Sequence, residues 1–504
     1  MPVMERAPDD RSEISPHAGR AALWVLVSLF AVLILFGASV VLSRSDRISG
    51  LFEDFFGTSS EELLPITRDV SALQGWSPPL TALLARAEEA VAAGELTLAE
   101  ELYDRALAHV SKEEQGRKEQ ADLPILRKLY DTVLLRGNEE RAEELLGILS
   151  FHGVPEEPLN ALRGFLRLRL ADIEGARELF SVSPENPEQS YGLLLIAILE
   201  GQHEEFPQLL AVIKTSSDPL LQHAATVLQG AQDEFALFQD GQPEHRATLL
   251  ARALAEVQQC ALAERLLMTV LEKDPEYRDA WLVLGYCRLM LENGSGAKEA
   301  FEKAYTLDPE KAETQYFLGV SHERSGDTAS AKTYFGYALQ NGFEPASTIH
   351  EKLAQLAIAE ASYAEAADHY RAILAQKEED HQAAYRALAT LLIEELQDPM
   401  EAEKIAHAAR EEYGDTPLVL DLLGWSALAL GKRDEAATYL TVAVQQDSSS
   451  PDAWYHRAAL AQEVGDRDAA LQAYRKAYEF AYLSDPDLAL KAAEKHNALM
   501  LKGQ

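Results

Sequence analysis

The stretch that decides the fold is AWLVLGYCRLMLENGSGAKEAFEKAYTLDP, residues 280–309. Its pattern is W-x2-L-G, then A-x3-F-x2-A, then P, carried by Trp281, Leu284, Gly285, Ala297, Phe301, Ala304 and Pro309. Gly285 and Ala297 have almost no side chain, which allows two helices to approach closely, while Trp281 and Phe301 fill the space beside them. We therefore predict a tightly packed helical hairpin.

Three further stretches carry the same pattern in phase. Their packing positions are Gly319 and Ala331, Gly424 and Ala436, and Trp454 and Ala470. The pattern resembles the tetratricopeptide repeat, a helix-turn-helix unit of about 34 residues. The resemblance implies an all-α fold in which stacked hairpins form a right-handed superhelix.

A small or polar residue recurs where each first helix should end, and a glycine there supplies a left-handed turn. The marker residues are Gly94, Gly137, Ala171, Gly201, Gly230, Gln258, Glu292, Gly326, Ala361, Gln397, Gly431 and Gly465. From Gln258 onward the steps are 34, 34, 35, 36, 34 and 34 residues, whereas earlier steps vary from 43 to 28. We predict a regular array over residues 244–484, degenerate hairpins over 80–243, and a capping helix over 485–504. Pro184, Pro187, Pro207, Pro219 and Pro243 should break the degenerate region into shorter helices.

Residues 21–43, AALWVLVSLFAVLILFGASVVLS, contain no charged residue and are long enough for one transmembrane helix. A tail, residues 1–20, precedes this span, and a juxtamembrane segment and linker, residues 44–79, follows it. Three arginines lie before the span (Arg6, Arg11, Arg20) and two lie after it (Arg44, Arg47). The positive-inside rule then places the N-terminus in the cytoplasm and the repeats in the periplasm of a bacterial inner-membrane protein.

The charge balance and the missing motifs exclude several classes of function. The chain has 46 basic and 82 acidic residues, a net charge of -36, which disfavours nucleic acid as a partner. Its two cysteines, Cys260 and Cys287, form no C-x-x-C pair, and whether they bond to each other is left open. We expect no catalysis, no cofactor, no metal site and no small-molecule substrate; a cryptic enzyme site within residues 185–243 is the least favoured alternative.

The resemblance implies that partners bind to the concave surface, which the first helix of each repeat lines. The side chains expected there are Arg252, Leu282, Tyr286, Leu289, Tyr316, Arg324, Arg386, Trp425, Leu428 and Tyr455. Each of them could instead pack within its own repeat. The acidic body favours an apolar or aromatic partner segment with basic flanks.

Two functional hypotheses follow. The first is a non-catalytic scaffold that holds protein subunits of an envelope complex together, as anchored repeat proteins of this kind do in pilus assembly, polysaccharide export or cytochrome maturation. The second is a cytoplasm-facing regulatory adaptor of a membrane enzyme or protease. It resembles anchored repeat regulators of lipopolysaccharide assembly, although those carry two C-x-x-C pairs and this sequence has none.

Overall fold

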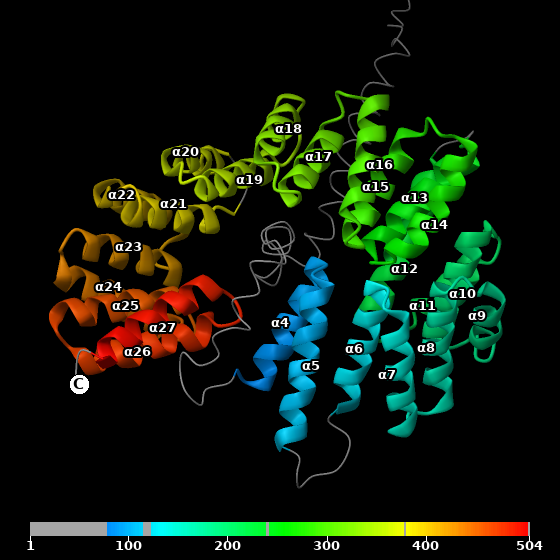
Figure 1. Ribbon diagram of the computed structural model, residues 1–504, viewed down its shortest axis with the longest axis horizontal. Coiled ribbons are helices and arrows are strands. Elements are labelled where there is room, and N and C mark those ends of the chain that lie inside the picture. The colour runs from blue at the N-terminus through cyan, green and yellow to red at the C-terminus, as the bar shows by residue number, and fades with distance from the viewer. Residues whose placement is uncertain (1–77, 114–121, 238–240, 377–379, 502–504) are drawn as a thin grey trace, which may run out of the picture. The chain divides into compact units, whose positions relative to one another are not determined.

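The computed structural model describes residues 78–113, 122–237, 241–376 and 380–501. In these ranges the chain forms 24 α-helices and no β-strand (Figure 1). The prediction of an all-helical fold is confirmed for this part of the chain. Every described residue belongs to the second of two compact units, Phe55–Gln504.

The predicted membrane span, residues 21–43, lies outside the described ranges, together with the tail before it and most of the juxtamembrane segment. Among the helices that the structure does describe, none combines the length and the apolar character needed to cross a membrane.

The region predicted as degenerate hairpins contains nine of these helices. Their bounds are α4 Leu80–Ala93, α5 Leu96–Glu113, α6 Asp122–Arg136, α7 Glu139–Phe151, α8 Glu156–Arg169, α9 Ile173–Phe180, α10 Pro187–Glu200, α11 Phe206–Ile213 and α12 Pro219–Ala236. The second helices α9 and α11 are short, with eight residues each.

The region predicted as a regular array, with its closing helix, contains the other fifteen. Their bounds are α13 Pro243–Glu256, α14 Cys260–Lys273, α15 Arg278–Met290, α16 Gly294–Leu307, α17 Ala312–Arg324, α18 Thr328–Gln340, α19 Ala346–Ala359, α20 Tyr363–Leu374, α21 Gln382–Glu394, α22 Pro399–Tyr413, α23 Pro417–Ala429, α24 Arg433–Gln446, α25 Pro451–Val464, α26 Arg467–Ala481 and α27 Pro486–Leu501.

The turn between the two helices of a hairpin is made by a residue with left-handed backbone. The marker residues with positive φ are Gly94, Gly137, Ala171, Gly201, Gln258, Glu292, Gly326, Ala361, Gln397, Gly431 and Gly465. At Gly326 and Gly465, which have φ of 77° and 84°, the left-handed turn carries no steric cost because glycine has no Cβ. The predicted turn is therefore confirmed at every marker except Gly230.

The prediction at Gly230 is wrong, because this glycine lies inside α12, an unbroken helix of 18 residues. The buried residues Ala224, Leu228, Ala231 and Phe235 recur at intervals of three or four, so one apolar face continues past the glycine. Gly230 is exposed and nothing lies near the position that its Cβ would take. α12 is thus a single helix inserted between two hairpins.

Four of the five prolines named in the prediction begin helices rather than interrupt them, and the fifth, Pro184, lies in the turn before α10. Pro187, Pro207, Pro219 and Pro243 each lie in the first or second position of a helix, where a missing N–H breaks no hydrogen bond. The region is divided into separate helices as predicted. Each of the helices that these four prolines begin, however, starts at or next to a proline and ends before the next proline is reached.

Each regular hairpin is held together by the packing positions of the opening pattern. A Cβ added to Gly319 would lie 2.6 Å from Phe335, and one added to Gly424 would lie 2.6 Å from Leu440. Gly285 faces Phe301 in the same way. The small partners on the second helices are fully buried, namely Ala297, Ala304, Ala331, Ala436 and Ala470.

The two tryptophans of the pattern tie each hairpin to the turn before it. The indole N–H of Trp281 donates to the carbonyl of Pro275 over 2.8 Å, and that of Trp454 donates to the carbonyl of Ser448 over 2.9 Å. In both cases the acceptor lies six residues earlier. Pro309 ends a unit, and its carbonyl accepts a hydrogen bond of 2.6 Å from Gln315 in the next one.

Successive hairpins stack so that their first helices also contact one another. Such contacts join α13 to α15 and α15 to α17, and then α21 to α23, α23 to α25 and α25 to α27. Contact of α19 with α17 or α21 is at most slight. We call α13, α15 and α17 the first stretch of this row, and α21, α23, α25 and α27 the second stretch.

Candidate protein-binding face

Every residue predicted to line the groove lies on a first helix of these two stretches. The first stretch carries Arg252, Leu282, Tyr286, Leu289, Tyr316 and Arg324, and the second carries Arg386, Trp425, Leu428 and Tyr455. Their exposure separates residues that a partner can reach from residues that hold the repeats together.

Four of these residues are buried, in contrast to the prediction. Leu289, Tyr316, Leu428 and Tyr455 are exposed by only 2%, 3%, 6% and 8%. The ring of Tyr316 stacks on Phe343, with centroids 4.5 Å apart, and the ring of Tyr455 packs edge-on against Tyr474 at 5.5 Å. These side chains are occupied by packing between neighbouring helices, which the sequence pattern does not separate from groove lining.

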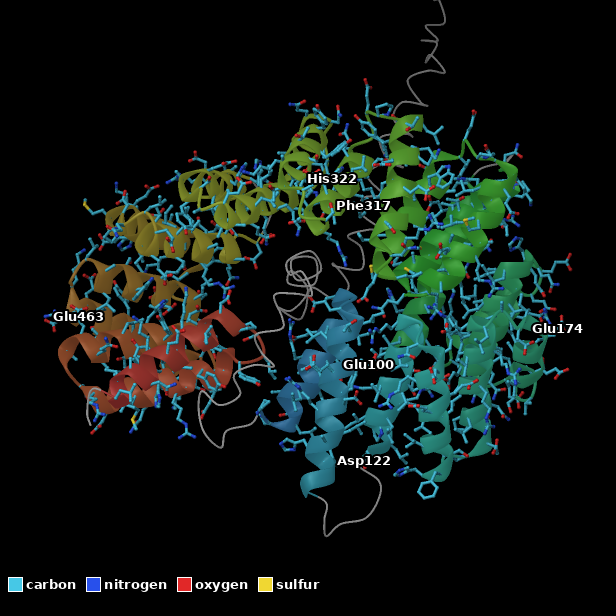
Figure 2. The ribbon with its side chains drawn as sticks, viewed as in Figure 1. Glu100, Asp122, Glu174, Phe317, His322 and Glu463 are labelled. Carbon is cyan, nitrogen blue, oxygen red and sulfur yellow. The ribbon has the colours of Figure 1, made fainter. Side chains whose placement is uncertain are left out.

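Most of the other predicted groove residues of the first stretch also contact side chains of neighbouring helices. Arg252 forms an ion pair with Glu234 of α12, and the half-buried ring of Tyr286 meets Phe317 edge-on at 5.9 Å. Figure 2 marks Phe317 on α17, where its ring stacks on Phe301 at 5.2 Å. Leu282 is partly buried, and only Arg324 of this group is well exposed.

A buried ion pair between α17 and α19 was not predicted. The ammonium of Lys352, a residue exposed by only 4%, lies 3.3 Å from a carboxylate oxygen of Glu323. Burial lowers the pKa of Lys352, while burial raises the pKa of Glu323. The pair joins α17 to α19, two first helices that otherwise have little contact with each other.

In the second stretch two ion pairs link helices that are not neighbours in sequence. Arg386 of α21 lies 3.4 Å from Asp452 of α25, and Lys491 of α27 lies 3.2 Å from Glu394 of α21. The side chains of Arg386 and Lys491 are each 53% exposed. Ion pairs this exposed contribute little to stability and exchange readily with other charges.

The second stretch also contains a buried histidine–aspartate pair that contacts Trp425. His456 of α25 and Asp421 of α23 are exposed by 7% and 2%. The Nδ1 of His456 lies 2.8 Å and 3.0 Å from the two carboxylate oxygens of Asp421. The imidazole also stacks on the indole of Trp425, with centroids 4.1 Å apart and the ring planes at 11°.

Asp421 and His456 were not among the predicted site residues, although the sequence holds a signal for both. Asp421 is the one charge in the apolar run PLVLDLLGWSALA, residues 417–429. An isolated charge on a buried helix face needs a partner, because desolvating it alone is costly. His456 stands 35 residues later, about one repeat, which places it on the adjacent first helix.

The described residues contain no cluster of three or more His, Cys, Asp or Glu side chains suited to a metal ion. Cys260 and Cys287 are free thiols, and both are buried. Interaction with the Cys260 thiol, together with burial, raises the pKa of Cys287 well above its ordinary value. The raised pKa favours the protonated thiol of Cys287 over its thiolate.

The stacked hairpins and the row of first helices define a helical-repeat protein. Residues 248–312, 316–384 and 422–486 match the family model of the tetratricopeptide repeat. These segments make up less than half of the chain and are similar to the tetratricopeptide repeat. Stacked repeats of this kind present an extended concave surface for binding.

One curated protein resembles part of the chain. The general transcriptional corepressor ssn6 of Schizosaccharomyces pombe is 30% identical over 93 residues, which cover 18% of this chain and 8% of the corepressor. The match thus spans less than a tenth of that protein's length.

Solved structures of similar fold include the Cut9–Hcn1 hetero-tetramer of the APC/C, with 14% identity and a TM-score of 0.32 over 87% of this chain and 99% of that one. They also include Pseudomonas aeruginosa pilF, with 17% identity and a TM-score of 0.33 over 46% of this chain and 99% of that one. PilW, described as a type IV pilus biogenesis factor, is 17% identical with a TM-score of 0.30, over 51% of this chain and 99% of that one.

Proposed function

We propose that this protein is a non-catalytic scaffold that binds protein partners through the second stretch of its first-helix row. The observation that supports this proposal most directly is the set of residues on that face. A partly exposed Trp425 lies on the same stretch as two charged pairs, Arg386 with Asp452 and Lys491 with Glu394, whose basic side chains are about half exposed. An aromatic anchor surrounded by exchangeable charges is typical of surfaces on which a few residues carry most of the binding energy.

The partner is proposed to be a subunit of a bacterial envelope complex, with the scaffold held in the inner membrane by residues 21–43 and its repeats in the periplasm. This part of the proposal depends on the apolar run and on the distribution of arginines in the sequence. The cytoplasm-facing regulatory adaptor remains the alternative, since the same binding face would serve either orientation.

Site-specific photo-crosslinking tests the binding face. A photoreactive residue is placed at Arg386 on α21 in the full chain, and a matched one at Ala437, which is exposed on the second helix α24. The proposal expects a discrete crosslinked protein at position 386 and a much weaker one at 437. Equal crosslinking at both positions, or none at 386, would reject this face as the binding surface.

The orientation is tested separately by reporters fused after Gln504. Active alkaline phosphatase would support the periplasmic scaffold, whereas a fluorescent, phosphatase-negative fusion would support the cytoplasmic adaptor. The second result would leave the binding face intact and change the compartment in which its partner is sought.

A further inference from the structure

The contacts around Trp425 identify which residues fix the position of this indole. Asp421 and Trp425 are four residues apart on α23, so their side chains share one face of that helix. His456 enters between them from α25, where it contacts Asp421 through Nδ1 and Trp425 through its ring face. The edge of Tyr455 meets the imidazole from the side, at 5.9 Å and 74°.

We infer that His456 is a positioning residue for partner binding: clamped by Asp421, it holds the indole of Trp425 in the orientation in which a partner segment packs against it. This inference rests on the proposed function and adds to it the device that orients the anchor. Trp425 needs such support because its indole N–H is buried and has no hydrogen-bond partner among the described atoms. Stacking on His456 therefore takes the place of a hydrogen bond in fixing this side chain.

The charges near His456 favour the protonated imidazole. Burial alone lowers the pKa of His456, but the carboxylate of Asp421, helped by Asp452 and Glu394, outweighs burial and raises the pKa above its ordinary value. Lys491 of α27 acts on the neighbouring Tyr455, whose own pKa is raised chiefly by burial. The raised pKa favours the cationic imidazole, and a cation stacked on an electron-rich indole is an attractive arrangement.

Loss of this proton weakens two contacts together. The neutral imidazole no longer offers a cation to the indole, and it leaves the buried carboxylate of Asp421 without an opposite charge. The position of Trp425, and with it the affinity for a partner, should therefore depend on pH above the ordinary range of histidine.

The first experiment needs no partner. The tryptophan fluorescence of the full chain in detergent is recorded from pH 5.5 to 9.5, and the signal of the Trp425→Phe variant is subtracted to isolate Trp425. A protonated imidazole in contact with an indole quenches its emission. The emission of Trp425 should rise with pH, with a midpoint above about 6.5, the ordinary histidine value. This transition should disappear in His456→Gln and persist in the control His407→Gln, which changes an exposed histidine on α22.

A midpoint at or below that value, or a transition that survives in His456→Gln, would overturn the inference. Because no partner is involved, this result is independent of whether the protein binds partners through this face. If the fluorescence behaves as expected but Arg386 yields no crosslink, the proposed function fails while the stacked arrangement stands.

The second experiment connects positioning to binding. In His456→Gln the crosslink formed at position 386 should fall roughly fivefold, the effect of losing one well-placed anchor. The double variant Asp421→Asn with His456→Gln replaces the ion pair by a neutral amide pair and avoids an unpaired buried charge. It should recover part of the crosslink and lose its dependence on pH. Crosslinking that stays equal to the unmodified protein in both variants contradicts a positioning role.

Discussion

Five of the hairpin turns are made by residues that are not glycine. Ala171, Gln258, Glu292, Ala361 and Gln397 have φ between 53° and 65°, where a Cβ is close to the following carbonyl. The side chains of two of them form hydrogen bonds: Gln258 donates to the carbonyl of Val91, and Glu292 accepts from Thr97. The side chain of Ala361 has no polar atom and can make no such bond, so its turn is strained without compensation.

Ala361→Gly should therefore stabilise the protein by about 0.5–1 kcal/mol, because glycine adopts the left-handed turn without steric cost. The reverse change, Gly326→Ala, should cost about 1–2 kcal/mol, since its φ is 77° although no atom lies near the added Cβ. Denaturant unfolding followed by circular dichroism measures both. If the two substitutions shift stability in the same direction, backbone strain is not the dominant effect at these turns.

The left-handed turns are features that residue spacing can predict. Of the marker residues chosen by spacing, all except Gly230 have positive φ, because the turn recurs once in each hairpin. The positive φ of Gly153 and Gly342, which follow second helices, was not predicted.

The pair of Asp421 with His456 was not predicted, because the search for packing positions followed small and apolar residues and not an isolated charge with a partner one repeat later. The burial of Tyr316 and Tyr455 was not predicted either, because their position in the repeat predicts an exposed face but their rings are covered by neighbours.

Within each regular hairpin, the close approach of two helices depends on one missing side chain. Gly319 on α17 lies against Phe335 of α18, and the ring occupies the space that a Cβ would need. Gly336, also on α18, has nothing within 4 Å of that position. Gly319 and Gly336 both lie within helices, but only at Gly319 does a neighbouring side chain fill the space that a Cβ would need.

Gly319→Ala should destabilise the protein by about 1–3 kcal/mol through overpacking. Gly336→Ala should stabilise it by up to about 1 kcal/mol, because alanine is the better helix former. Thermal unfolding of the two variants measures the contrast. Equal effects of the two substitutions would show that the hairpin can open without cost, contrary to the packing described.

The buried pair between α23 and α25 makes the junction of these two helices dependent on pH. The pKa of His456 in the folded chain is raised above the unfolded value, so its contribution to stability is fully present below about pH 6.5. That contribution is lost as the pH rises through the raised folded pKa. Amide hydrogen exchange of α23 and α25, corrected for intrinsic rates, should therefore accelerate with rising pH. The variant that carries both Asp421→Asn and His456→Gln should lack this acceleration, and its presence there would assign it to another group.

For the whole molecule, the closing helix α27 covers the apolar face of the last repeat. Leu488, Ala489, Ala492 and Ala493 of α27 are buried in one cluster with residues of α25 and α26. The capping helix was predicted from sequence because a terminal repeat cannot leave its apolar face in water. The inserted helix α12 could not be predicted in this way, since the same apolar spacing fits one long helix or two short ones.

Deletion of α27 after Asp485 should expose this face. We expect binding of a hydrophobic dye and faster hydrogen exchange in α25 and α26, with little change in the distant α13 and α14. A milder change, Leu488→Ala, should cost about 2–4 kcal/mol at this end of the array. Glu494→Gln, at an exposed position of the same helix, is the control and should have no effect. A deletion without consequence for α25 and α26 would mean that α27 is not a cap.

The stacking of successive hairpins also affects how the chain folds during synthesis. Most helices pack against the helix just before or just after them, so few contacts join distant parts of the sequence. A ribosome releases the N-terminal hairpins first, and each one finds its packing partner as soon as the next emerges. At any moment of synthesis only the newest apolar face awaits its neighbour. A chain of this length can therefore mature repeat by repeat, with little unprotected surface on which nascent copies could associate.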